Sequence, residues 1–296
     1  MSPRITPAWV WIAVLGTFSG ALIQRGGVIL GYWGQVNNPT LAFSLIIVFA
    51  YVVSLLLCLR IAREHANSPA MHFAWMLFAG SCALSIVRHG VQCAMATGFF
   101  PNFHGEASYL PTQLPMAVAL VLLFVGLLAM WSAFSALGLG FHATRVDVAM
   151  VTLMLLMLPP ILFRDPERVP KFVTGWIAIL PFAGAVLLPG CAGIAVFLHR
   201  TAMQMRGGET ARFLQFLICY PAMRLVAMLI AVDSRLNAIP ALTVLGYAIF
   251  HTAPLVFTLA LAYRWRITAT AAAAMQGERD TWNELYPGET TASINR

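Results

Sequence analysis

Three residues with reactive side chains lie in three consecutive apolar stretches in the last third of the chain, and these are Cys191, Arg224 and His251. A thiolate can act as a nucleophile, a guanidinium can stabilise a thiolate or an oxyanion, and an imidazole can act as a general base. Pro189-Gly190 precedes the cysteine and Ala192-Gly193 follows it, which favours a bend in the helix and a cavity beside it. These residues therefore predict a catalytic cysteine assisted by a cation and a base.

The same order of residues resembles a family of membrane enzymes, the exosortases and archaeosortases, which have a Cys…Arg…His arrangement. The motifs that carry the resemblance are Leu-Met-Leu-Pro-Pro-Ile at 156–161, Cys-Ala-Gly-Ile at 191–194, Met-Arg-Leu-Val at 223–226 and Phe-His at 250–251. Members of that family are eight-span proteins of similar length that are thought to cleave and transfer proteins with a C-terminal sorting helix. The resemblance implies a cysteine transpeptidase or protease with a membrane-anchored protein as substrate, in which Cys191 is the nucleophile, Arg224 stabilises the anion and His251 is the base.

A second set of polar residues in apolar stretches favours binding without catalysis. Arg88, His89 and Gln92 lie in the third stretch and Gln215 in the seventh. Placing an arginine at the centre of a bilayer costs about 3 kcal/mol or more, so such residues usually have a function. Together with Arg224 they could line a cavity for an amphiphilic anion such as a lipid headgroup or a carboxylate. A transporter or binding protein is therefore the alternative to an enzyme.

Two of the histidines also allow a redox alternative, because two imidazoles at a matching depth can bind a b-type haem. His89 and His251 lie about nine and eleven residues from the predicted outer ends of their stretches. The sequence has no second histidine pair at the opposite depth, no c-type haem attachment motif and no nucleotide-binding motif. We therefore expect no cofactor and no metal. A haem-binding redox subunit is kept as the third hypothesis, after an enzyme and a transporter or binding protein.

The composition indicates that lipid surrounds most of the chain. Of its 296 residues 60% are hydrophobic and 10% are charged, whereas soluble domains have about 25% charged residues. The apolar residues form long blocks without strand-like alternation, which favours membrane helices over barrel strands. We predict an all-α polytopic bundle of about eight transmembrane helices at 8–24, 40–59, 71–98, 113–139, 146–163, 173–198, 212–232 and 240–263.

The basic residues between the spans predict the orientation of the bundle. With the N-terminus in the cytoplasm, about nine of them fall on the cytoplasmic side and five on the other, as the positive-inside rule requires. The protein would then lie in the cell inner membrane with both termini in the cytoplasm. Because these residues occur singly in short loops and form no patch, we expect membrane lipids and no nucleic acid as partners.

This orientation places the three candidate catalytic residues at similar depths. Arg224 is twelve residues from Arg212, and His251 is thirteen residues from Arg264, at the predicted inner ends of their helices. At about 1.5 Å per residue, both lie about 18–20 Å from the inner surface, with Cys191 about 5 Å nearer the cytoplasm. Their depths therefore allow the three side chains to meet.

The two ends of the chain differ in character. The first apolar stretch has no small-residue cleavage site before Arg25, so we expect a retained helix and not a cleaved signal peptide. We assign 1–266 to the transmembrane domain and 267–296 to a cytoplasmic tail. The alanine-rich segment 267–276 is predicted to extend the last helix, and the polar segment 277–296 is predicted to be flexible.

Overall fold

All regular secondary structure in the described part of the chain is helical. The computed structural model describes residues 8–29, 38–97, 106–138, 144–149, 152–153, 156, 180–205, 208–237 and 239–285. The helices are α1 (Ala8–Ile29), α2 (Asn38–Glu64), α3 (Pro69–Ala96), α4 (Glu106–Ala136), α6 (Leu180–Gln204), α7 (Glu209–Asn237) and α8 (Pro240–Leu285). The predicted all-helical fold is confirmed.

Six of these helices are long and apolar enough to cross a membrane. Their apolar segments are Ser44–Glu64, Pro69–Met95, Tyr109–Ala136, Val186–Gln204, Glu209–Ile230 and Pro240–Thr268. They contain 19 to 29 residues each, and a hydrocarbon core of about 30 Å requires about 20. Large apolar side chains such as Phe49, which is 69% exposed, point away from the bundle, where lipid can solvate them. The chain is therefore a multi-pass membrane protein.

The six helices correspond to six of the eight predicted spans. The first predicted span, 8–24, lies within α1, a helix of 22 residues. The fifth, 146–163, lies mostly outside the described residues, which are helical there at 145–149, 152–153 and 156. The count of eight spans therefore stays a prediction.

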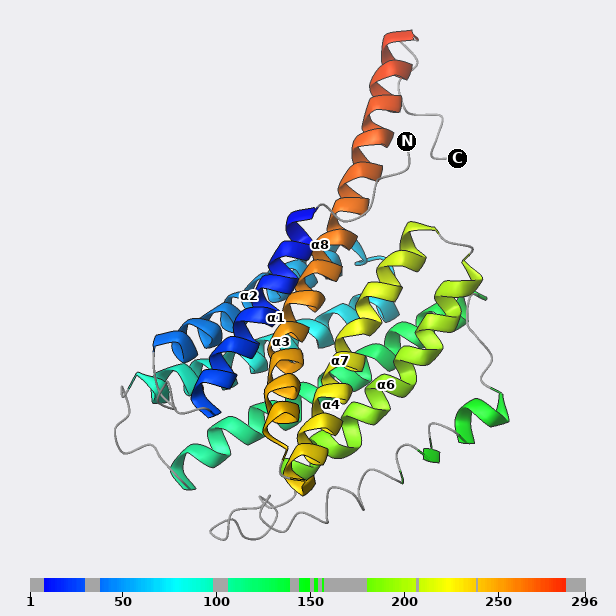
Figure 1. Cartoon of the computed structure of the whole chain (residues 1–296). Coiled ribbons are helices and arrows are strands. Elements are labelled where there is room, and N and C mark those ends of the chain that lie inside the picture. The colour runs from blue at the N-terminus through cyan, green and yellow to red at the C-terminus, as the bar shows by residue number, and fades with distance from the viewer. Residues whose placement is uncertain are drawn as a thin grey trace.

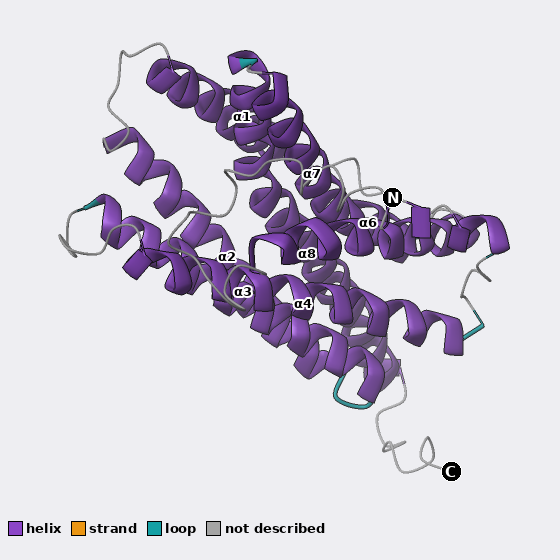
Figure 2. Cartoon of the chain, turned by 90° about the horizontal axis from the view of Figure 1, so that it is seen from below, coloured by secondary structure: helices purple, strands orange, loops and turns teal. Residues whose placement is uncertain are grey.

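Helices that follow one another along the chain pack side by side because their connections are short. α2 and α3 are joined through residues 65–68, α6 and α7 through 205–208, and α7 and α8 through 238–239, which favours antiparallel neighbours. The most extensive contacts join α3 to α4, α7 to α8 and α2 to α3 (Figure 1). α8 also contacts α1 and α2, and the turned view in Figure 2 places it among the other helices.

Glycines allow the closest helix contacts. A Cβ atom on Gly126 of α4 would lie 2.8 Å from the ring of Phe78 on α3, and one on Gly190 of α6 would lie 2.7 Å from the ring of Phe124 on α4. In a membrane, where helices associate through close packing and not through the exclusion of water, such small residues set how near two backbones come. α4 is therefore held tightly between α3 and α6.

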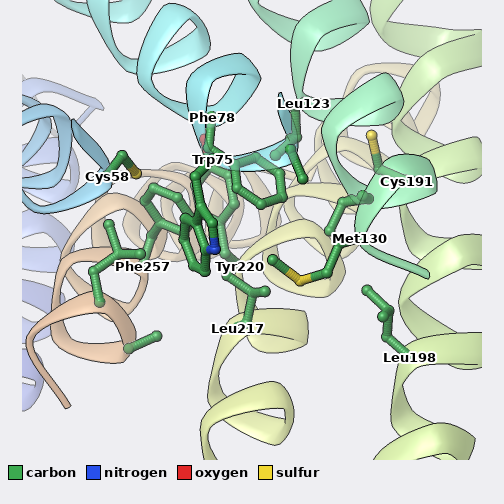
Figure 3. Packing of buried hydrophobic residues seen from close by; sticks show 14 of the residues in the cluster. Cys58, Trp75, Phe78, Leu123, Met130, Cys191, Leu198, Leu217, Tyr220 and Phe257 are labelled. Carbon is green, nitrogen blue, oxygen red and sulfur yellow. The ribbon is translucent and has the colours of Figure 1, made fainter. Parts of the chain in front are cut away.

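The apolar core lies between α2, α3, α4, α6, α7 and α8 and is rich in aromatic rings (Figure 3). Trp75 and Phe78 of α3 are fully buried, with their rings edge to face at 5.4 Å. Phe78 in turn meets Phe257 of α8 at 6.4 Å. Cys191 belongs to this core and is labelled in Figure 3. The core therefore joins helices that are far apart in the sequence.

A short helical segment at 145–149 is attached to the C-terminal part of α6. Both oxygens of the Asp147 carboxylate accept hydrogen bonds from Arg200, at 2.8 and 3.0 Å. The Thr144 backbone N–H and hydroxyl also donate to Asp147, at 3.1 and 2.7 Å, in a local N-terminal cap. The start of this segment therefore lies at the same end of the bundle as the end of α6.

α8 continues through the predicted domain boundary at 266. It has 46 residues, ends at Leu285 and projects beyond the bundle (Figure 1). At 1.5 Å per residue its length is about 69 Å, more than twice the thickness of the hydrocarbon core. The helix covers 267–276 as predicted, but it also includes 277–285, which we predicted to be flexible. The many alanines that precede this segment have the highest helix propensity, and they favour continuation of the helix.

Candidate functional site

A buried arginine, Arg224, lies halfway along α7. It is 5% exposed, fifteen residues from Glu209 and thirteen from Asn237, so it is about 20 Å from either end of the helix. Its Nη1 donates a hydrogen bond to the Tyr51 hydroxyl at 3.2 Å. Its guanidinium also lies 4.2 Å from the centre of the Phe250 ring, in a cation–π contact. α2, α7 and α8 therefore meet at this guanidinium.

Tyr51 connects the guanidinium to two further polar groups. The Tyr51 hydroxyl lies 3.1 Å from the hydroxyl of Tyr220, one turn before Arg224 on α7. The Tyr51 ring stacks on the imidazole of His89 on α3, at 5.8 Å and an interplanar angle of 19°. Because the Tyr51 oxygen accepts from Arg224, its own proton can go to Tyr220, which leaves the Tyr220 proton for a further acceptor. The network is thus arranged to donate hydrogen bonds.

Arg88 adds a second cation to the same place. Its guanidinium lies 5.9 Å from the centre of the Phe250 ring, so Phe250 contacts both arginines, and the two positive charges repel each other. The Nε atoms of Arg88 and Arg224 are buried and have no hydrogen-bond partner among the described residues. In that part of the chain no ion pair includes either arginine. The site therefore has two positive charges that no carboxylate among the described residues neutralises.

A small cavity lies against these groups, between α2, α3, α4 and α7. Its volume is about 10 Å³, which is room for about one water molecule. The residues that line it are Tyr51, Ser81, Ser85, Arg88, His89, Met116, Ala119, Leu120, Leu123, Tyr220 and Arg224. The Ser81 hydroxyl donates to the Ala119 carbonyl of α4 at 2.8 Å. The polar side of the cavity is thus made by α2, α3 and α7, and α4 closes its apolar side.

The predicted binding residues divide into two groups. Arg88 and His89 line the cavity, and the Gln92 side chain hydrogen-bonds to the His89 ring from the next turn of α3. Gln215 lies elsewhere, with its Nε2 3.8 Å from the sulfur of Met203 on α6. The structure therefore brings together the three predicted residues of α3 and leaves Gln215 apart from them.

The predicted catalytic residues are not joined by the contacts that their proposed chemistry requires. Cys191 is fully buried in the apolar core, where Arg224 influences it only through its charge. The His251 Nδ1 lies 2.8 Å from the Tyr247 carbonyl, and its ring packs 3.7 Å from the Tyr247 ring. No hydrogen bond within the described residues joins Cys191 to His251, although a base must bond to the nucleophile that it activates. Catalysis by Cys191, Arg224 and His251 stays a prediction.

Aromatic side chains pack against the rings of the two histidines that we considered as haem ligands. The face of the His89 ring is covered by Tyr51, and the cavity beside it holds about 10 Å³. The His251 ring lies between Tyr247 and Phe250 of its own helix. A ring nitrogen coordinates iron in the plane of the ring, so these ring contacts do not occupy it, and haem binding by His89 and His251 stays a prediction.

Sequence reasoning missed Tyr51, Tyr220, Phe250, Ser81 and Ser85. A helical signal was present for three of them, Ser81, Ser85 and Tyr220. Ser81, Ser85, Arg88 and His89 follow the spacing of one helix face, and Tyr220 is four residues before Arg224. Tyr51 had no such signal, because its partners on α3 and α7 are far away in the sequence.

No protein-family model matches the chain, and no curated protein or solved structure is significantly similar to it.

Proposed function

We propose that this membrane protein binds the anionic group of a small amphiphile, a carboxylate or a phosphate, at Arg88 and Arg224. The observation that carries the proposal is the pair of guanidiniums that share the Phe250 ring with no described carboxylate beside them. Two like charges in a low-dielectric interior raise the energy of the protein. A bound anion offsets this energy by pairing with both.

The donors around the cavity match an oxyanion. Each guanidinium has an Nε–H without a partner among the described residues, and the Tyr220 hydroxyl can donate as well. A phosphate or carboxylate accepts several charge-assisted hydrogen bonds, and it forms two parallel ones with a single arginine. The apolar wall made by Met116, Leu120 and Leu123 suits the alkyl part of an amphiphile. Anion recognition is therefore favoured over recognition of a cation or a neutral sugar.

Binding requires the cavity to open. The cavity has room for about one water molecule, and a carboxylate or a phosphate has more heavy atoms than that. Prolines lie within the helices that carry the site, Pro221 in α7 and Pro254 in α8, and proline is a common cause of helix bending. We propose that bending of α7 and α8 at these positions admits the anion. A closed site halfway through the bundle is also where transporters hold their substrates.

The orientation of the bundle is part of the proposal. We propose that both termini are cytoplasmic and that the protein lies in the cell inner membrane. Support comes from Arg60 and Arg63 at the end of α2 and Arg264 of α8, which lie at one end of the bundle, where Arg264 interacts with Glu64 of α2. Under the positive-inside rule this end faces the cytoplasm.

The proposal is tested by thermal unfolding of the purified protein in dodecylmaltoside micelles. The probes are hexyl phosphate and hexanoate, and hexanol is the uncharged probe of the same chain length. At a concentration of one hundred times its Kd, a ligand that binds only the folded protein adds about 2.7 kcal/mol to the free energy of unfolding. We expect at least one anionic probe to raise the midpoint, and hexanol to leave it unchanged.

Variants identify the site. Arg88→Gln and Arg224→Gln should each abolish the shift caused by the anionic probe. The matched control is Arg212→Gln, because Arg212 also lies on α7 but is 47% exposed and paired with Glu209 at 3.4 Å, so this variant should respond like the wild type. An equal response of all variants, or no response of the wild type to either anionic probe, would overturn the proposal.

A further inference from the structure

A groove lies on the outer surface of α2 near its C-terminal end, apart from the buried cavity. Its volume is about 300 Å³, and it is lined by Leu56, Leu59, Arg60 and Arg63. These positions follow the spacing i, i+3, i+4 and i+7, so all four side chains lie on one face of the helix. The two leucines are followed by the two arginines along the helix axis. The groove is therefore apolar at one end and cationic at the other.

The cationic end of the groove is reinforced by α8. The Arg60 guanidinium lies 5.1 Å from the centre of the Trp265 ring, in a cation–π contact. Glu64 lies 3.8 Å from Arg60 and also interacts with Arg264 of α8. The Glu64 carboxylate is thus shared between two arginines, Arg60 and Arg264. The local charge remains positive.

The apolar half and the cationic half of the groove lie at different depths of the membrane. The apolar segment of α2 is Ser44–Glu64, so Leu56 and Leu59 lie where acyl chains are, and the two arginines lie at the level of the headgroups. Leu56 is 61% exposed and Trp265 is 38% exposed, and tryptophan is enriched at this level of membrane proteins. The groove therefore has the polarity of a phospholipid along its length.

We propose that this groove binds one anionic phospholipid of the leaflet on its side, with the phosphate at Arg60 and Arg63 and an acyl chain along Leu56 and Leu59. The excess of guanidinium over carboxylate selects a net negative headgroup over a zwitterionic one. A free phosphate ion would leave the leucine half of the groove uncovered. A phospholipid therefore fits the whole groove better than a free phosphate does. The planar ring of Trp265 holds the Arg60 guanidinium in place for the phosphate.

Native mass spectrometry of the detergent-solubilised full-length protein tests this site. The protein is incubated with dioleoylphosphatidylglycerol, with dioleoylphosphatidylcholine, which has the same acyl chains, or with phosphatidylglycerol plus inorganic phosphate. We expect the wild type to retain phosphatidylglycerol in preference to phosphatidylcholine, and an equal concentration of phosphate not to displace it. One basic residue near an anionic headgroup contributes about 1 kcal/mol. Retention should therefore fall about fivefold in Arg63→Gln and about 30-fold in Arg60→Gln/Arg63→Gln.

A matched double variant controls for net charge. Arg145→Gln/Arg212→Gln also removes two exposed arginines, and it should retain phosphatidylglycerol like the wild type. Trp265→Ala should weaken retention without a change of charge. Equal retention of both lipids by the wild type, equal losses in the two double variants, or displacement by inorganic phosphate would each overturn the proposal. Because the probes and residues differ from those of the buried cavity, this result is independent of anion binding at Arg88 and Arg224.

Discussion

Replacing Arg88 by methionine is expected to stabilise the protein when no anion is bound. This is unusual, because most substitutions of buried residues are destabilising. The reason is that Arg88 has a positive charge beside that of Arg224, has an Nε–H without a partner among the described residues, and makes one cation–π contact at 5.9 Å. Methionine is flexible and can fill the space of the aliphatic part of the arginine.

The magnitude follows from two opposing contributions. An arginine at the centre of a transmembrane helix costs about 3 kcal/mol, and Arg88 is eight residues from the end of α3 at Ala96, or about 12 Å, so its cost is lower. The lost cation–π contact is worth about 0.5–1 kcal/mol. The net gain on Arg88→Met is therefore about 1–2 kcal/mol. For a chain of this size this corresponds to a rise of about 2–8 °C in the unfolding midpoint.

The assay is thermal unfolding in dodecylmaltoside with chloride as the only small anion, followed by circular dichroism, with and without hexyl phosphate. Without the probe the Arg88→Met midpoint should exceed that of the wild type. With the probe only the wild-type midpoint should rise, so the difference between the two proteins shrinks or reverses. Arg224→Met is the internal contrast, because Arg224 donates a hydrogen bond to Tyr51 and its loss should not stabilise the protein.

A lower midpoint for Arg88→Met without any probe would refute this reasoning. It would mean that the Arg88 charge is compensated within the protein and contributes to its stability. The proposal that an external anion neutralises the pair would then lose its physical basis. An unchanged difference between the two proteins when hexyl phosphate is added would refute the binding step separately.

Three further predictions concern other contacts. Tyr51→Phe removes the hydroxyl that accepts from the buried guanidinium of α7, and it should lower the free energy of unfolding by about 1–3 kcal/mol in the same thermal assay. His65 lies in the connection between α2 and α3, and its pKa is lowered by burial and by the positive charge of Arg264. Arg264→Gln should therefore raise the pKa of His65 toward the usual range, which an NMR titration of the imidazole would measure. An unchanged pKa would contradict this account. The lowered pKa also means that the unfolded chain binds a proton first as the pH falls below about 6.5, so His65 makes the folded protein less stable at acidic pH. Gly126→Ala places a methyl group 2.8 Å from a buried ring and should destabilise the protein by about 1–3 kcal/mol. Gly16→Ala is the control and should not destabilise the protein, because no atom lies within 4 Å of the added methyl group. Equal unfolding midpoints of the two variants would disprove the close contact.

The sequence by itself determined that the chain spans a membrane and is helical. Both follow from local properties, namely the length of the apolar blocks and the scarcity of charged residues within them. It also predicted a function for Arg88 and Arg224, because a cation in an apolar block is costly wherever its neighbours lie. These conclusions need no knowledge of how the helices pack.

Only the tertiary structure decided which polar side chains meet. The rise of 1.5 Å per residue sets the depth of a side chain, and depth alone made Cys191, Arg224 and His251 equally plausible partners. Whether two side chains at one depth touch depends on helix rotation, about 100° per residue, and on which helices are neighbours, and both are set by packing across the bundle. Packing placed Tyr51 against Arg224, 173 residues away in the sequence, and placed Cys191 in the apolar core.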